Sequence, residues 1–172
     1  MFLDEIFATP IWGFDLDLDV DSMKYWCYGC MKENPGRVIS NVGGWQSEDY
    51  RRFTNTPLLE LVGVILKESH HIASDLGIPE GERWIENLWI NINPKYSYNQ
   101  VHVHPEARLS GVFYVSAPEK SGDICFTRSG GYALGTVAPN QTRYSNAEWC
   151  YPPKKNRFCL LYTSPSPRDM PR

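Results

Sequence analysis

The fold is decided by residues 98–115, which read Y-N-Q-V-H-V-H-P-E-A-R-L-S-G-V-F-Y-V. Valine, phenylalanine and tyrosine recur in the stretch, which predicts strands over 100–104 and 109–116 joined by a turn. Side chains alternate faces along a strand, so His102 and His104 point the same way with Cα atoms about 6.5 Å apart. Both imidazoles can then bind one metal ion, and imidazole is the commonest protein ligand for transition metals. His102 and His104 are therefore the predicted metal ligands.

The segment before this stretch also has strand character. Residues 87–93 read N-L-W-I-N-I-N, with Leu88, Ile90 and Ile92 on one face. The opposite face carries Trp89, Asn91 and Asn93. These three residues are candidates to line a pocket beside the histidines. The alternative is a half-exposed strand whose polar face meets water.

Two helices are predicted ahead of the strands. Apolar residues recur at intervals of three and four over residues 57–76, and Gly77 ends this helix. An earlier helix is expected to begin with Asp21 and Ser22 as caps and to stop at residues 34–36. His70 and His71 are adjacent on the second helix, so they read as surface histidines. The order predicts a mainly β fold with N-terminal helices, an α+β chain built on a β-sandwich or barrel.

Bulk properties narrow the class of protein. The chain has 172 residues and a net charge of -3, which predicts one domain and does not indicate nucleic-acid binding. No apolar run approaches the ~20 residues of a membrane helix, and the N-terminus lacks a basic start, so a cytoplasmic protein is expected. The five cysteines show no disulfide framework. Cys27 and Cys30 form a C-x-x-C that reads as two incidental helix cysteines, with a redox pair as the alternative.

The C-terminal segment differs in character from the rest. Residues 159–169 read C-L-L-Y-T-S-P-S-P-R-D, and three prolines between residues 165 and 171 oppose a packed element. The segment resembles one reading frame of a sequencing-library transposase adapter. We therefore expect a single domain over residues 1–158 and a non-native tail over 159–172, with few native-like contacts beyond its first residues. The alternative is a natural disordered tail.

Several classes of metal site are compatible with a histidine pair. A structural zinc site would need four N or S ligands, and no such partners flank His102. A cupin would need a glutamate three or four residues after the pair, whereas Glu106 comes too early and Arg108 stands nearby. The class that remains is the non-haem iron oxygenase, in which two histidines and a carboxylate hold Fe(II).

At this point the sequence resembles a known family, the 2-oxoglutarate and Fe(II) dependent oxygenases found in bacteria, marine phages and environmental sequences. The resemblance rests on residues 40–47, 88–93, 99–105 and 109–115 with Ser121-Gly122. It implies a double-stranded β-helix, or jelly-roll, core with helices packed on one sheet. It implies Fe(II) as the metal, 2-oxoglutarate as the cosubstrate, and the cytoplasm of a bacterial cell or phage-infected host.

The resemblance also assigns roles to single residues. His102 matches the first iron ligand, while His104 stands where the wider superfamily has Asp or Glu. Iron would then be held by three histidines or by a carboxylate from elsewhere. Tyr114 resembles the tyrosine that donates a hydrogen bond to a 2-oxoglutarate carboxylate.

The same family places a further histidine and a carboxylate-binding arginine beyond residues 153–158, where the adapter-like tail begins. Arg157 precedes that histidine position and is not the expected arginine. The core is thus expected to be incomplete at the C-terminus, and the chain to bind metal weakly and turn over little. Competing interpretations are a non-catalytic jelly-roll structural or binding module and a cupin-like metal enzyme that does not use 2-oxoglutarate. The substrate and the oligomeric state are not determined.

Overall fold

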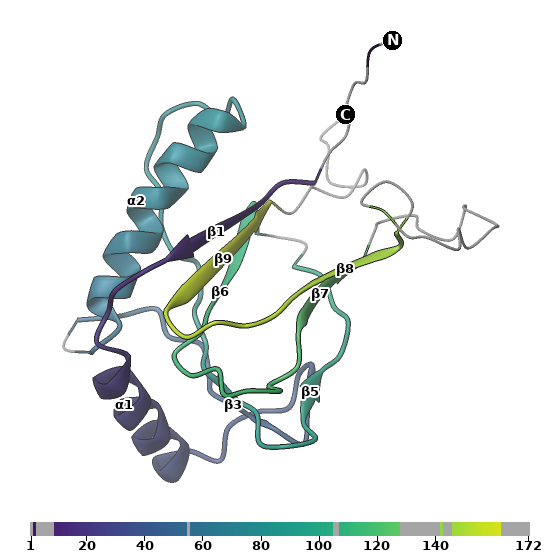
Figure 1. The fold of residues 1–172 in the computed structure, drawn as a ribbon. Coiled ribbons are helices and arrows are strands. Elements are labelled where there is room, and N and C mark those ends of the chain that lie inside the picture. The colour runs from purple at the N-terminus through teal and green to yellow at the C-terminus, as the bar shows by residue number, and fades with distance from the viewer. Residues whose placement is uncertain are drawn as a thin grey trace.

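A computed structural model describes residues 2, 9–54, 56–104, 107–127, 142 and 146–162. The described elements are mainly β-strands, and both helices lie in the N-terminal half of the chain (Figure 1). They are β1 (Ile11–Asp15), α1 (Val20–Glu33), β2 (Asn41–Val42), β3 (Trp45–Gln46), α2 (Leu59–Asp75), β4 (Asn91–Ile92), β5 (Tyr98–Asn99), β6 (Leu109–Phe113), β7 (Ile124–Thr127), β8 (Glu148–Tyr151) and β9 (Arg157–Tyr162).

The largest sheet of the described residues is three-stranded and antiparallel, in the order β1-β9-β6. Phe158 of the central strand lies between Phe14 of β1 and Phe113 of β6, and Leu160 lies between Trp12 and Gly111. A Cβ atom at Gly111 would come within 2.8 Å of the Leu160 side chain. The absence of a side chain there lets Leu160 pack down against β6.

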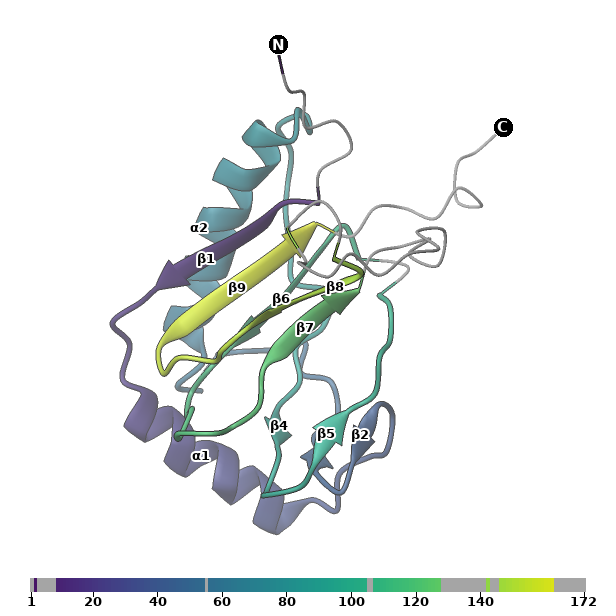
Figure 2. The same ribbon diagram turned by 45° about the vertical axis from the view of Figure 1, so that its right-hand side comes forward.

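Helix α2 covers one face of this sheet, α1 lies near the lower end of its strands, and the β7–β8 pair lies on the other side (Figures 1 and 2). Phe158 and Leu160 are buried together with Ile72 of α2. A second cluster joins Met23 of α1 to Leu61 of α2. Burying such side chains is the main source of stability in a domain of this size, at roughly 1.5–3 kcal/mol each. The core therefore lies between the helices and the sheet.

The predicted helices are present, with small shifts at their ends. The N-cap of α1 is Asp19, whose Oδ1 accepts from the Ser22 backbone N–H at 3.0 Å, so the expectation that Asp21 and Ser22 cap the helix was wrong. The last residue of α2 is Asp75, and Gly77 follows at φ 65°, a conformation that favours glycine. His70 and His71 are exposed on α2, as expected.

The strands around the histidines are shorter than the sequence predicts. Residues 87–93 form only an isolated bridge between Leu88 and Tyr50 and the two-residue strand β4. Residues 100–104 form no strand, because hydrogen-bonded pairing with β2 ends at β5 and the Gln100 N–H bond to the Ser40 carbonyl. Val101 and Val103 are each 81% exposed, so no neighbouring strand of the described residues covers them.

The described elements make a β-rich fold with two helices. They form one three-stranded sheet and three two-stranded sheets, and no barrel closes among them. A jelly-roll therefore stays a prediction. No helix in the described ranges is long and apolar enough to cross a membrane.

A disulfide joins Cys125 of β7 to Cys150 of β8, which the expected lack of a disulfide framework did not anticipate. The two residues are 25 apart in sequence but directly opposite each other in the register of the pair. Register is a property of the paired strands, so spacing alone did not reveal it. Cys27, Cys30 and Cys159 are free thiols.

The first residues of the adapter-like segment are part of the sheet. Cys159–Tyr162 form the last four residues of β9, and Cys159 and Leu160 are buried. Native-like contacts were expected only for the first few residues of the segment that begins at residue 159. Residues 163–172 lie outside the described part of the chain, and the boundary of the domain at residue 158 stays a prediction.

Replacing Leu160 by alanine should lower the free energy of unfolding by about 2–5 kcal/mol, because it removes a buried side chain from the central strand. The same change at Leu59, which is 52% exposed on α2, should cost about 0.5 kcal/mol or less. Urea unfolding followed by circular dichroism measures both. Equal effects of the two substitutions would contradict the packing of residue 160 in the core.

Candidate metal centre

The two predicted ligands lie side by side although their segment is not a regular strand. The ring centroids of His102 and His104 are 4.8 Å apart, with one ring edge toward the other's face. His102 Nδ1 lies 2.7 Å from the Gln100 carbonyl oxygen. A carbonyl only accepts, so Nδ1–H is the donor, and in the neutral imidazole Nε2 is then the atom with a free lone pair. This arrangement is the one that metal-binding histidines use to orient the ring.

The Trp89 ring packs beside the ring of His104. The two ring centroids are 5.6 Å apart, and both residues are partly buried. Burial, and after it the positive charge that His102 can carry, lowers the pKa of His104 below 6.5. His104 is therefore neutral at pH 7, which is the form that binds a metal.

No third ligand accompanies the pair in the described part of the chain. The one group of three potential ligand atoms within 4.8 Å of one another, among residues that the structure describes, is Cys125, Glu148 and Cys150, and it contains neither histidine. Glu106, the carboxylate nearest in sequence, lies outside the described residues. The described site thus supplies two imidazoles to a metal.

The other two candidate pocket residues are exposed, and one of them has a defined bonding role. Asn93 Nδ2 donates to Asn99 Oδ1 at 3.0 Å, and Asn99 Nδ2 donates to Ser40 Oγ at 3.3 Å. Asn91 lies in β4, opposite Gln46. Trp89 is the candidate for which the structure gives a contact with the histidines. The pocket role of Asn91 and Asn93 stays a prediction.

Asn93 also lies against the loop over residues 41–47, next to Gly44. A Cβ atom at Gly44 would lie 2.1 Å from Asn93 Oδ1, so only glycine fits beside this amide. Asn41 holds the same loop through donation from its Nδ2 to the Gly44 carbonyl at 2.9 Å. The loop, which contains β2 and β3, is therefore held against β4 and β5, the strands that precede the histidines.

Tyr114 directly follows β6. Its backbone extends the pairing of β6 with β9 by hydrogen bonds to the start of β9 and to the residue before it. Its N–H donates to the Arg157 carbonyl, and its carbonyl accepts from the Asn156 N–H, both at 2.9 Å. Burial, with smaller contributions from Cys159 and Asp123, raises the pKa of Tyr114 to about 12. The phenol thus keeps its proton at neutral pH and can donate a hydrogen bond to an anion.

A cavity of about 340 Å³ that the sequence did not reveal lies on the sheet face away from the helices. It is lined by Ile11, Gly13, Asp15, Tyr151, Arg157 and Cys159. Arg157 Nε and Nη2 donate to the two oxygens of Asp15 at 2.7 and 3.1 Å, and Lys154 Nζ lies 2.6 Å from Oδ2. These cations hold the pKa of the Asp15 carboxyl well below its usual range. The Arg157 guanidinium is thus paired with Asp15, and the expectation that Arg157 is not the cosubstrate-binding arginine stays a prediction.

Residues 87–167 match the family model described as "Putative 2OG-Fe(II) oxygenase". The matched segment is just under half of the chain and contains Trp89, His102, His104 and Tyr114. This segment is similar to the 2OG-Fe(II) oxygenase family, which confirms the resemblance found in the sequence. The match continues past Phe158 to residue 167, into the adapter-like segment. No curated protein matches the chain.

In the metal-free protein the His104 imidazole should titrate below pH 6.5, because burial and the neighbouring His102 both disfavour its protonated form. The folded state thus binds this proton less readily than the unfolded state. Its contribution to stability is complete above the ordinary pKa and declines as the pH falls below it. Histidine ring signals followed by NMR measure the midpoint. His102→Ala should raise the midpoint part of the way, and a midpoint above 6.5 in the wild type would contradict the arrangement.

Proposed function

We propose that this chain carries the iron-binding part of a non-haem Fe(II), 2-oxoglutarate-dependent dioxygenase that hydroxylates a substrate not yet identified. The observation that carries the proposal is the pair of imidazoles, with ring centroids 4.8 Å apart, inside the segment that matches the family model.

The two histidines fit a ferrous ion by their chemistry. A lowered pKa favours the neutral, metal-binding form of His104, and the Gln100 carbonyl orients the ring of His102. Imidazole is a usual ligand of Fe(II). Bound Fe(II) and 2-oxoglutarate would supply oxidation of a substrate C–H bond by O2, coupled to decarboxylation of 2-oxoglutarate to succinate. The protein's own part is to hold the ligands, to orient the cosubstrate and to exclude water.

Two further residues have roles in this proposal. Tyr114 donates its phenolic proton to a carboxylate of 2-oxoglutarate, which its raised pKa permits at neutral pH. Trp89 packs beside His104 and shields one side of the metal from water. Asn91 and Asn93 are the remaining candidates for contact with the substrate.

A set of two imidazoles gives a ferrous ion no anionic charge from the protein. Family members that use Asp or Glu in place of His104 supply one negative charge, and the described residues offer no third ligand near the pair. We therefore expect this 172-residue chain to bind Fe(II) weakly and to turn over little 2-oxoglutarate. We also propose that it acts in the cytoplasm of a bacterial cell or a phage-infected host.

Anaerobic titration with Fe(II), followed by paramagnetic broadening of amide NMR signals, should affect the signals around residues 102–104 first. His102→Ala should abolish this selective broadening, because one imidazole alone binds iron far more weakly than a pair. His70→Ala, which removes an exposed histidine from α2, is the matched control and should leave it unchanged. Any Fe(II)-dependent conversion of 2-oxoglutarate to succinate should show the same dependence on the two variants.

Broadening that does not depend on His102 would overturn the proposed iron site. Selective iron binding with no effect of added 2-oxoglutarate on the broadened signals, and no succinate, would favour a cupin-like metal protein. No selective binding at any Fe(II) concentration would favour a non-catalytic module.

A further inference from the structure

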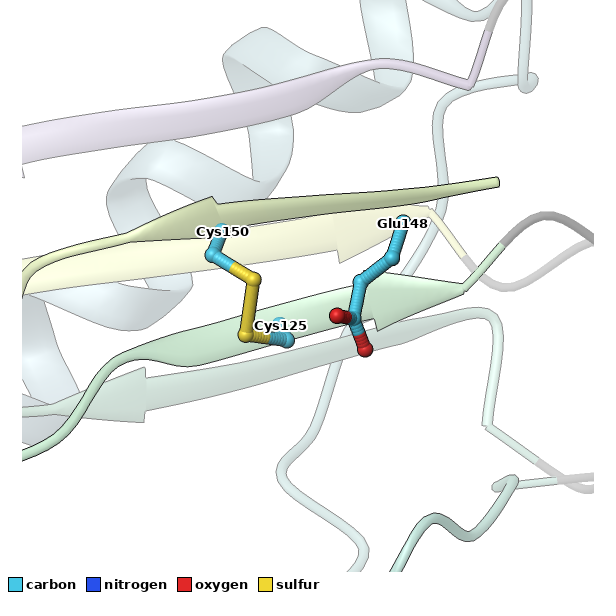
Figure 3. Close-up of side chains that lie close together, drawn as sticks. All are labelled: Cys125, Glu148 and Cys150. Atoms are coloured by element: carbon cyan, nitrogen blue, oxygen red, sulfur yellow. A yellow bond between two sulfur atoms is a disulfide. The ribbon is translucent and has the colours of Figure 1, made fainter. Parts of the chain in front are cut away.

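A second set of metal-binding atoms lies on the β7–β8 pair, away from the histidines in sequence. Cys125, Glu148 and Cys150 each offer one ligand atom, and these atoms all lie within 4.8 Å of one another. Figure 3 shows the carboxylate of Glu148 beside the bond that joins the two sulfur atoms. Nothing in the proposed oxygenase chemistry uses this cluster.

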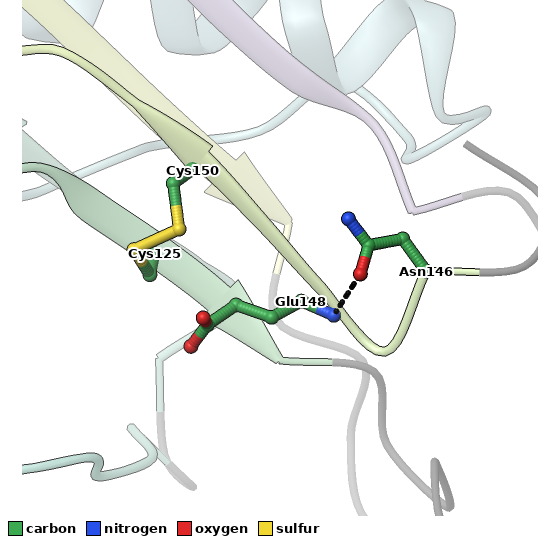
Figure 4. Close-up of a disulfide and its surroundings, with 4 residues drawn as sticks. All are labelled: Cys125, Asn146, Glu148 and Cys150. Atoms are coloured by element: carbon green, nitrogen blue, oxygen red, sulfur yellow. Dashed lines mark hydrogen bonds between the residues drawn. A yellow bond between two sulfur atoms is a disulfide. The ribbon is translucent and has the colours of Figure 1, made fainter. Parts of the chain in front are cut away.

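The pairing of the two strands accounts for the proximity of the three side chains. Cys125 and Cys150 are directly opposite in the antiparallel register, with Cα atoms 4.1 Å apart. Glu148 precedes Cys150 by two residues in β8, so its side chain points to the same face of the pair. Asn146 Oδ1 accepts from the Glu148 backbone N–H at 3.3 Å, at the start of β8 (Figure 4). The cluster is therefore positioned by backbone pairing rather than by chance contact of flexible chains.

The three groups are of the types that bind zinc. Two thiolates and one carboxylate are common zinc ligands, with bonds of about 2.3 Å to sulfur and 2.0–2.2 Å to oxygen. Three protein ligands leave a fourth tetrahedral position for water. Cys125 and Glu148 are exposed, so an ion can reach the site without any opening of the fold.

We propose that Cys125 and Cys150 are a reversible redox pair whose reduced form, together with Glu148, binds one Zn²⁺ ion. The structure has the oxidised form, in which the sulfur atoms are bonded to each other. A dithiol reductant breaks the S–S bond: its own two thiols become a disulfide, and Cys125 and Cys150 each gain one hydrogen. Zn²⁺ then displaces the two thiol protons, which pass to solvent, because the thiolate is the metal-binding form.

The two states exclude each other but have the same structural effect. A disulfide sulfur is not a thiolate, so the oxidised pair does not hold the ion. In either state covalent or metal bonds connect β7 to β8. They are the disulfide bond in the oxidised state and the sulfur–zinc–sulfur bonds in the reduced state. The two strands would therefore stay joined under oxidising conditions through the disulfide and in a reducing, zinc-containing cytoplasm through the metal.

The free cysteines are less suited to this role. Cys27 and Cys159 are buried, and burial, followed by the neighbouring Cys30, raises the pKa of the Cys27 thiol to about 11. Cys27 and Cys30 belong to one helix, and no third ligand atom accompanies them in the described residues. Substitution of Cys27 and Cys30 is therefore the control for substitution of Cys125 and Cys150.

Co²⁺ is the probe for the test, because thiolate ligands give it an intense near-ultraviolet charge-transfer band and tetrahedral geometry gives it visible bands. The full chain is reduced with a phosphine, which does not compete for the metal, and is titrated with Co²⁺. One equivalent should bind with both features and be displaced by one equivalent of Zn²⁺. The disulfide-oxidised protein should show no charge-transfer band.

Matched variants identify the ligands. Cys125→Ser with Cys150→Ser should abolish the band, whereas Cys27→Ser with Cys30→Ser should leave it in place. Glu148→Gln should weaken Co²⁺ binding by about tenfold or more, since loss of even an outer-shell partner costs 10–100-fold in affinity. His102→Ala should not change the band, so the result is independent of the proposed iron site.

Absence of a charge-transfer band in the reduced wild type would overturn the proposal. So would a band that survives Cys125→Ser with Cys150→Ser, or one that is lost on removal of Cys27 and Cys30 alone. The redox half has its own measurement: mass spectrometry after alkylation should find Cys125 and Cys150 linked in the oxidised protein and modified after reduction. Bound Zn²⁺ should slow their alkylation, and equal rates with and without zinc would contradict the site.

Discussion

The pairing of β9 between β1 and β6 is the constraint on which the rest of the structure depends. It brings the chain's two ends into one sheet, and it aligns Phe14, Phe158 and Phe113 on the face that α2 covers. Without this central strand, β1 and β6 would have no common neighbour. The apolar face of α2 would then have no sheet to pack on, and an amphipathic helix draws most of its stability from such packing.

The opposite face of the same strand lines the cavity. Arg157 and Cys159 point away from the helices into the cavity with Asp15, and Tyr114 hydrogen-bonds through its backbone to the residues that begin β9. One alternation of side chains thus divides β9 into a structural face and a polar face. The histidine pair lies apart from this sheet, on a segment reached through the short strands β4 and β5. Its position depends on the side-chain bonds of Asn41, Asn93 and Asn99 more than on a ladder of paired strands.

Much of the secondary structure could be predicted because its signals are local. The 3.6-residue period of residues 57–76 and the glycine after it define α2 within two residues, and the run of β-prone residues from Leu109 defines β6. The extent of the strands near the histidines could not be predicted in this way. A strand exists only where another strand lies beside it, and Val101 and Val103 have the composition of a strand without a neighbour among the described residues. The disulfide between Cys125 and Cys150 could not be predicted for a related reason. The spacing of cysteines in the sequence does not reveal the register between two distant strands.

By itself the sequence determined the family to which the chain is similar, through a pair of histidines two residues apart, a tyrosine after the following strand, and motifs within the segment that the family model matches. These are properties of residue type and short spacing, which do not change when the chain folds. Only the tertiary structure decided which groups meet. It turned His102 and His104 toward each other with Trp89 alongside, and it engaged Arg157 with Asp15. It also set Glu148 beside two cysteines that are 25 residues apart. Such contacts depend on strand register and burial, which are set by the packing of the whole chain.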